Sequence, residues 1–226
     1  MGADVFAARP DLLGADADAV LGWSLRDLCA TGPEADLTRT DRAQPALFAT
    51  AYALWEAFRA AVGTDPAAAA GHSLGEYTAL AAAGVFDFST GLRLVAARGA
   101  AMDVAAQRAD SGMAALIGVD EESAQTIAAT RREEGGSLWV ANLNAPGQIV
   151  VAGGAADIAW VVEHGREVGV RRAIPLNVAG AFHSPYMSAA ADQLAEALEA
   201  ATFEPPRFPV YANATAAPVV DVAENL

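Results

Sequence analysis

The feature that most constrains this chain is the pentapeptide Gly71-His72-Ser73-Leu74-Gly75, which stands between an alanine-rich run and a helix-forming run. A strand that reverses into a helix within two residues crowds its own backbone, so we expect the flanking positions to lack side chains. This is the pattern of a nucleophile elbow, which exposes a serine at its apex beside unpaired helix N-terminal N–H groups. Ser73 is therefore the candidate nucleophile. The alternative is a glycine-rich turn with an incidental serine.

Composition excludes several classes of function. The net charge of −14 argues against a nucleic-acid binder, which needs a basic face. All 14 basic residues are arginine, which excludes lysine-type phosphate loops and Schiff-base chemistry. The three histidines lack metal-ligand spacing and no Cys/His cluster exists, so no metal site is expected.

The sequence predicts a cytoplasmic protein without a membrane segment. No run of 18 apolar residues lacks charges or turn formers. Asp4, Arg9 and Asp11 stand where a signal peptide would need an apolar core. The single cysteine, Cys29, excludes an internal disulfide and fits a reducing compartment.

Hydrophobic periodicity predicts an α/β fold in which a smaller unit interrupts a larger one. Between Ser111 and Leu176 the pattern predicts the order strand, helix, strand, strand, helix, strand, which is a ferredoxin-like unit. We expect residues 111–176 to be a subdomain inserted in a catalytic body formed by residues 1–110 and 177–226. In the body, residues 3–31 are expected to form two helical patterns, the second with Val20, Leu21, Leu25 and Leu28 on one face. Further helices are expected at about 43–62, from the elbow to Gly84, from Asp87 or Ser89 to about Ala109, and over 185–200. A last strand is expected over 208–212.

A serine nucleophile needs a base, and the chain offers three histidines. His72 adjoins Ser73, and its side chain is expected to project away in the tight turn. His164 is expected in mid-helix among charged neighbours, where it would be solvated. His183 lies in a loop after the predicted insert, and loops on a rigid scaffold commonly carry catalytic groups. His183 is the candidate base, with a structural histidine as the alternative.

These residues belong to a set of motifs that resembles the malonyl-CoA:acyl carrier protein transacylases and the acyltransferase domains of polyketide and fatty acid synthases. The resemblance implies an α/β-hydrolase-like body with an inserted ferredoxin-like subdomain, which agrees with the pattern above. The motifs cover almost the whole chain in the family's order: Gln44-Pro45-Ala46-Leu47, residues 71–77, Arg98-Gly99 with Met102, Asn142-x-Asn144-x-Pro146-x-Gln148, residues 180–184 and residues 211–215.

The resemblance implies a ping-pong reaction without a cofactor. Ser73, activated by His183, would take a malonyl group from malonyl-CoA and pass it to the phosphopantetheine thiol of an acyl carrier protein. The Leu74 N–H would be one oxyanion donor. Arg98 would bind the malonyl carboxylate through two parallel hydrogen bonds, and the alternative is an ion pair on the helix surface. A monomer is expected.

The resemblance also implies substrate contacts. Phe182 resembles the malonyl-selective version of its loop, because methylmalonyl-selective domains carry a smaller residue there. Asn144, Gln148 and Arg172 resemble residues that contact CoA. Since acyl carrier proteins are acidic, a local basic patch is expected to dock the partner, drawn from Arg131, Arg132, Arg166, Arg171 and Arg172.

Two departures from the family pattern predict truncation at both ends. Family members begin with a strand and a Gly-Gln-Gly-Ser-Gln loop that supplies the second oxyanion donor, whereas Met1-Gly2 match the residues after that loop. The family also orients its histidine with a segment that would lie beyond Leu226. We therefore expect residues 1–226 alone to be less stable and slower than a longer form.

Two other functions stay open at this level. An α/β-hydrolase-type serine esterase or thioesterase would share the elbow and would place an acidic residue between serine and histidine. Asp103, Asp110, Asp120 and Asp157 lie in that interval. A non-catalytic carrier-protein-binding module of the same fold is the second alternative.

Overall fold

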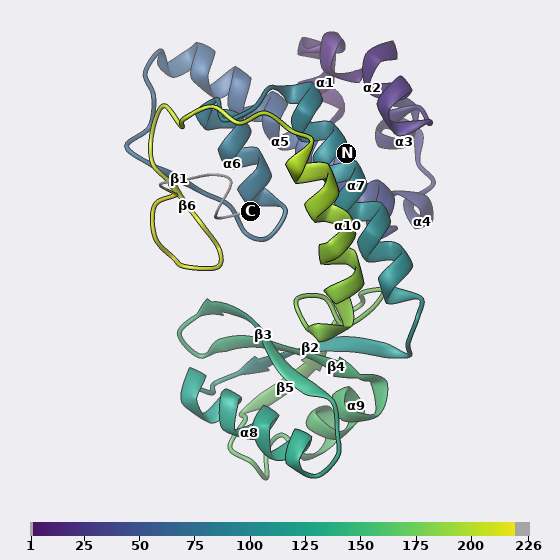
Figure 1. Ribbon diagram of the computed structural model, residues 1–226, viewed down its shortest axis with the longest axis vertical. Helices are drawn as coiled ribbons and strands as arrows, with labels where there is room; N and C mark the ends of the chain where they lie inside the picture. The colour runs from purple at the N-terminus through teal and green to yellow at the C-terminus, as the bar shows by residue number, and fades with distance from the viewer. Residues whose placement is uncertain (1, 220–226) are drawn as a thin grey trace. The chain divides into compact units, whose positions relative to one another are not determined.

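The computed structural model describes residues 2–219, which form the expected mixed α/β fold (Figure 1). The chain divides into two compact units. The first takes residues up to Ala100 together with those from Gln193 onward, and the second runs from Ala101 to Asp192. No helix within residues 2–219 is long and apolar enough to cross a membrane.

Three helices form the centre of the first unit: α5 (Thr40–Val62), α6 (Gly75–Ala83) and α7 (Phe88–Ala106), of which residues up to Ala100 belong to this unit. Phe48 of α5 and Leu80 of α6 are fully buried. Small residues let the helices approach one another closely, since a Cβ on Gly91 of α7 would lie 2.3 Å from the Phe48 ring. α5 begins three residues earlier than expected, and α7 ends three residues earlier than expected.

The segment before α5 consists of short helices. The second helical pattern expected within residues 3–31 is wrong as a single helix, because Gly22 adopts a left-handed conformation and ends the first part. Ser24 then caps the next helix, accepting a hydrogen bond from the Asp27 N–H. The elements are α1 (Ala3–Ala8), η1 (Pro10–Leu13), α2 (Ala15–Leu21), α3 (Leu25–Thr31) and α4 (Glu34–Leu37).

A pair of short parallel strands completes the first unit. β1 (Ala69–Ala70) leads into the elbow, as expected, and pairs with β6 (Val210–Tyr211). Parallel pairing carries the residues that follow both strands to the same end of the pair. The chain reaches β6 through η2 (Pro185–Met187) and α10 (Ser188–Glu199).

The second unit contains a four-stranded antiparallel sheet with the order β3-β4-β2-β5. The two helices that connect its strands along the chain, α8 and α9, lie on one face of the sheet (Figure 1). The expected element order is the one observed, although the second of these helices ends four residues early. The elements are β2 (Ser111–Ile117), α8 (Glu121–Glu133), β3 (Leu138–Ala145), β4 (Gln148–Gly154), α9 (Ala155–His164) and β5 (Arg172–Pro175).

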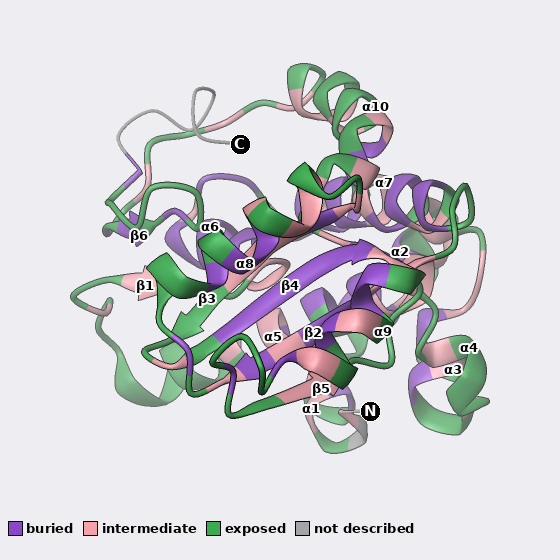
Figure 2. Cartoon of the chain, turned by 90° about the horizontal axis from the view of Figure 1, so that it is seen from below, coloured by how far each residue is buried: buried purple, intermediate pink, exposed green. Residues whose placement is uncertain are grey.

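The two faces of this sheet have different partners. Leu116 and Val151 point toward α8 and α9. Met113 and Val150 point to the opposite face, where they pack with Ala181 and Phe182. β4 is therefore buried along most of its length (Figure 2), which explains its nearly continuous apolar sequence.

Candidate functional site

Ser73 lies at the apex of the turn between β1 and α6, with a backbone φ of 51°. A positive φ is unusual for a serine and persists only where the surrounding structure holds it. The Gly75 N–H donates to the His72 carbonyl at 2.8 Å, and the Glu76 N–H donates to the Ser73 carbonyl at 3.2 Å. The turn therefore closes directly into the first turn of α6, as expected for a nucleophile elbow.

The two glycines of the elbow differ in what they do. A Cβ on Gly71 would lie 2.0 Å from the carbonyl group of Gly75, so residue 71 must lack a side chain. A Cβ on Gly75 would meet nothing within 4 Å. The expectation of crowding at both positions is thus right for Gly71 and wrong for Gly75, because the chain has already turned away at that point.

Arg98 of α7 reaches the serine directly. Its Nη2 donates to the Ser73 Oγ at 3.0 Å, and its Nη1 donates to the Gln44 Oε1 of α5 at 2.6 Å. The guanidinium also lies 5.8 Å from the centroid of the Tyr77 ring. Gly99 permits this approach, because a Cβ there would lie 2.9 Å from the Thr40 carbonyl oxygen.

The Arg98 guanidinium donates hydrogen bonds to two neutral oxygens. Within residues 2–219 no carboxylate forms an ion pair with it, which rules out the surface ion pair considered above. Desolvation by burial lowers the pKa of Arg98, while the nearby Tyr77 and Glu76 raise it. An arginine stays protonated under these conditions, so the site holds a partly desolvated positive charge beside Ser73.

A polar network supports the elbow from below. The Asn213 side chain accepts a hydrogen bond from the Ser73 N–H at 2.7 Å and donates one to the Gly71 carbonyl at 2.6 Å. The Asn213 N–H in turn donates to the Glu76 carboxylate at 3.1 Å. Burial raises the pKa of Glu76, although the hydrogen bonds from Asn213 and the charge of Arg98 lower it.

His183 belongs to the second unit, in a turn whose backbone is also constrained. It has a φ of 56° and an exposed side chain. The Ser184 hydroxyl donates to the Ala181 carbonyl at 2.5 Å, and the Ala181 N–H donates to the Ser111 Oγ at 3.1 Å. The loop that carries His183 is therefore tied to the start of β2.

The predicted substrate residues of the second unit occupy one face of its sheet, except for Asn144. Gln148 and Arg172 both stand opposite Ile117 in the register, on the face that Phe182 covers. Asn144 falls at a register shift between Leu143 and Ala145, so it does not share that row. All three polar side chains are exposed.

The other histidines have different surroundings. His72 is exposed. The expectation for His164 is wrong, because it is the last residue of α9 and is half-buried. Its ring stacks on Trp160 at 5.6 Å, and its Nδ1 lies 3.1 Å from the Trp160 carbonyl oxygen.

Several charged residues considered from the sequence have structural partners. Asp120 caps α8, and Asp103 accepts a hydrogen bond from Gln107. Arg131 pairs with Asp157 and Glu134, so among residues 2–219 it is the one predicted docking arginine that forms ion pairs. No group of three or more His, Cys, Asp or Glu side chains in the described part of the chain could hold a metal ion.

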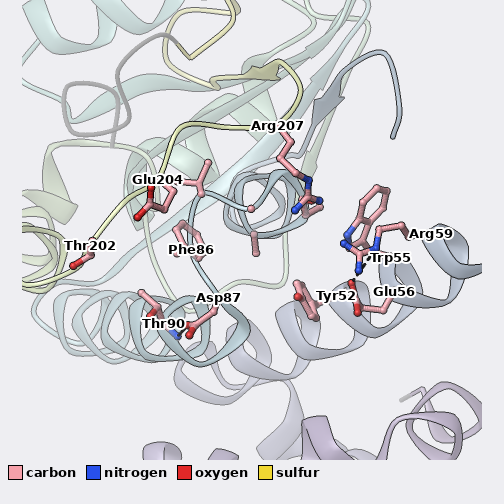
Figure 3. Close-up of a pocket in the computed structure, with 14 residues that line it drawn as sticks. Tyr52, Trp55, Glu56, Arg59, Phe86, Asp87, Thr90, Thr202, Glu204 and Arg207 are labelled. Atoms are coloured by element: carbon pink, nitrogen blue, oxygen red, sulfur yellow. Dashed lines mark hydrogen bonds and ion pairs between the residues drawn. The ribbon is translucent and has the colours of Figure 1, made fainter. Parts of the chain in front are cut away.

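A cavity of about 470 Å³ lies elsewhere on the first unit (Figure 3). Arg59 and Arg207 line it together with Tyr52, Trp55 and Phe86. Both arginines already have carboxylate partners, which are Glu56 and Asp65. None of the predicted site residues lines this cavity.

The sequence pattern gave no role to Gln44, Glu76 or Asn213, although all three stand in the motifs quoted above. Glu76 could have been found as a candidate site residue, because it is an acidic residue in an otherwise apolar, alanine-rich helix. Asn213 lies 140 residues from Ser73, and no local pattern connects the two.

Comparisons with known proteins agree on one family. The acyl transferase domain family matches residues 1–224. A malonyl CoA-acyl carrier protein transacylase of Bacillus subtilis is 40% identical over 209 residues, which cover 92% of this chain and 66% of that protein. The chain therefore spans just under two thirds of the length of this relative.

Two solved structures have similar folds. The malonyl CoA-acyl carrier protein transacylase of Burkholderia pseudomallei has a TM-score of 0.89 at 38% identity, covering 100% of this chain and 75% of that one. A malonyl-transacylase solved with a type II polyketide synthase acyl-carrier protein has a TM-score of 0.86 at 39% identity, covering 94% and 69%.

Glu76 yields a prediction about pH and stability. Its pKa in the folded state is raised above the usual 4.5, so the folded chain binds this proton more tightly than the unfolded chain does. The free energy of unfolding therefore falls as the pH rises from 4.5 through the folded-state pKa. Glu76→Gln keeps an acceptor for the Asn213 N–H and removes this titration. In urea unfolding at a series of pH values, the variant should gain stability relative to the parent across that interval. The exposed Glu34→Gln controls for the loss of one charge, and identical pH profiles for Glu76→Gln and the parent would contradict the assignment.

Proposed function

The chain belongs to the acyl transferase domain family, and we propose that it moves a malonyl group from malonyl-CoA to the phosphopantetheine thiol of an acyl carrier protein. The observation that carries the proposal is Arg98, a partly desolvated guanidinium without a carboxylate partner among residues 2–219, 3.0 Å from the Ser73 Oγ. A malonyl thioester carries a free carboxylate near its reactive carbonyl. A guanidinium meets a carboxylate with two parallel hydrogen bonds, which Gln44 and Ser73 cannot match.

The reaction proceeds in two halves. The Ser73 Oγ attacks the thioester carbonyl of malonyl-CoA while its proton passes to His183, and the C–S bond breaks as CoA leaves with that proton. The carrier-protein thiol then attacks the malonyl ester as its proton passes to His183, and His183 gives that proton to the Ser73 Oγ as the ester C–O bond breaks. The Leu74 N–H at the start of α6 stabilises the oxyanion of each tetrahedral intermediate. No cofactor takes part.

The second unit supplies the remaining substrate contacts. Phe182 packs against the sheet beside Val150 and restricts the acyl pocket to an unbranched malonyl group. Asn144, Gln148 and Arg172 contact CoA. The shared register of Gln148 and Arg172 supports this role for those two residues, because it places both side chains on the face that Phe182 covers.

The finer fold assignment is part of the same proposal. We assign the first unit to an α/β-hydrolase-like body and the βαββαβ segment of the second to a ferredoxin-like insert. The strand order β3-β4-β2-β5 supports the insert, and the β1–elbow–α6 sequence supports the body. We also propose a monomeric, cytoplasmic enzyme. The single cysteine, Cys29, is buried in the first unit, which is consistent with a reducing compartment.

The alternative functions account for fewer observations. An esterase would need an acidic residue to orient His183, and three of the four candidates named above, Asp103, Asp120 and Asp157, have structural partners. It would also leave Arg98 unexplained. A non-catalytic module would not require the constrained conformation of Ser73. Hydrolysis of a p-nitrophenyl ester faster than malonyl transfer would favour the esterase.

Ser73 is predicted to carry the acyl group. When the protein is mixed with malonyl-CoA, intact-protein mass spectrometry should show a malonyl adduct, and Ser73→Ala should abolish it. Ser89→Ala, which changes a serine elsewhere in the same unit, should keep it. An adduct that survives in Ser73→Ala would rule out this serine as the nucleophile.

Arg98 is predicted to select donors with a carboxylate. Loss of a charge-assisted bidentate contact costs about 1.5–3 kcal/mol, so Arg98→Ala should lower kcat/KM for malonyl-CoA by about tenfold to a hundredfold. Acetyl-CoA, which has no carboxylate, should lose far less. The control is Arg93→Ala on the same helix, whose partners are Ser89 and Thr90. Equal losses on both donors would instead indicate a structural role.

Docking of the acidic carrier protein is predicted to use Arg166 and Arg171, two exposed arginines of the second unit. Reversing both to glutamate should slow association by about tenfold at low salt, and the difference should shrink as salt is added. Arg26→Glu with Arg93→Glu makes the same charge change on the first unit and should have a smaller effect. Unchanged association at low salt would place docking elsewhere.

A further inference from the structure

The left-handed conformation of Ser73 requires an explanation beyond the elbow sequence. Gly71 explains why the chain can turn, since no side chain fits there. It does not explain why the following serine stays at a φ of 51°, in a region that a residue with a Cβ disfavours. Such a conformation persists when neighbouring groups fix the peptide planes around it.

Asn213 binds the two peptide groups that flank His72, and the second of these is the peptide that precedes Ser73. Its Oδ1 accepts from the Ser73 N–H at 2.7 Å, and its Nδ2 donates to the Gly71 carbonyl at 2.6 Å. The two backbone groups have opposite polarity and lie two residues apart. A carboxamide is suited to them because one rigid plane carries both an acceptor and donors.

Asn213 is itself held in place by two elements. It follows β6, whose residues Val210 and Tyr211 pair with Ala69 and Ala70 of β1. Because the pairing is parallel, the residues after β6 arrive where the elbow begins. The Asn213 N–H then donates to the buried Glu76 carboxylate at 3.1 Å, which fixes its backbone relative to α6.

We infer that Asn213 is a positioning residue that holds Ser73 in its left-handed conformation, with Oγ directed at Arg98, and that it thereby sets the rate of Ser73 acylation. The inference rests on the proposed function of Ser73. The Asn213 side chain hydrogen-bonds to the backbone of the elbow, so its effect should fall on the chemical step and leave malonyl-CoA binding unchanged. A purely structural residue would instead weaken rate and binding together.

The test compares Asn213→Ala with Thr215→Ala. Thr215 lies in the same turn, and its hydroxyl accepts a hydrogen bond from the Ala217 N–H. Asn213→Ala should slow single-turnover acylation by malonyl-CoA about tenfold to a hundredfold, as expected for a misplaced nucleophile. Thr215→Ala should stay within about twofold of the parent on the same basis.

Binding is measured separately, in the Ser73→Ala background where no acyl transfer can occur. The malonyl-CoA dissociation constant should be the same with Asn213 and with Asn213→Ala. An unchanged acylation rate, or rate and binding that fall together, would overturn the inference. Where Asn213→Ala does not fold, the isosteric Asn213→Asp is judged by the same criteria. It keeps the acceptor for the Ser73 N–H and loses the donor to Gly71.

A serine-directed sulfonyl fluoride separates this inference from the proposed function. The reagent reports on the reactivity of Ser73 without needing a malonyl donor. A parent protein that reacts with the sulfonyl fluoride and not with malonyl-CoA contradicts the proposed function. Slower sulfonylation in Asn213→Ala, with Thr215→Ala unaffected, would still support the positioning role, and equal sulfonylation would contradict it.

Discussion

The close approach of Gly71 to the backbone of Gly75 is the constraint on which the rest of the first unit depends. It lets β1 turn into α6 without an intervening loop, so that Ser73 stands at the apex and helix N–H groups follow at once. At this apex Ser73 adopts a left-handed conformation, which a residue with a Cβ disfavours. Hydrogen bonds of Asn213 with the elbow backbone and with Glu76 stabilise this conformation.

The alanine content of α6 is a second requirement for the elbow, because the helix that follows Ser73 must pack closely against other elements. α6 is buried over nearly all of its surface, and residues 79–83 are alanines apart from Leu80. Small side chains let α5 pack against α6. The glycines at 91 and 99 of α7 let that helix approach α5 closely. Alanine makes up much of the hydrophobic fraction of the chain, and no helix in residues 2–219 is long and apolar enough to cross a membrane.

Local patterns predicted those parts of the fold that local physics decides. The order of strands and helices from Ser111 to Leu176 and the strand–turn–helix around Ser73 follow from periodicity and turn residues. The split between α2 and α3 was missed because the apolar face continues across Gly22, although the backbone does not. Contacts such as Arg98 with Gln44, or Asn213 with Ser73, join residues 54 and 140 positions apart, and no periodicity encodes them. The role of Gly75 was misjudged for a related reason, since the space around a residue depends on the fold and not on its neighbours in sequence.

The electrostatics of the site follow from the same packing. Folding partly removes Arg98 from water and gives it two neutral oxygens, from Gln44 and Ser73. The guanidinium is thus oriented, while no carboxylate in residues 2–219 forms an ion pair with it. A charge held this way interacts more strongly with an anion than the same charge in water, because little solvent has to be displaced when the anion binds. In the proposed reaction, a malonyl carboxylate would compete with the Ser73 Oγ for the guanidinium. Substrate binding would then release the serine oxygen from its donor at the moment when it must act as a nucleophile, so one arginine would couple recognition of the acid to activation of the alcohol.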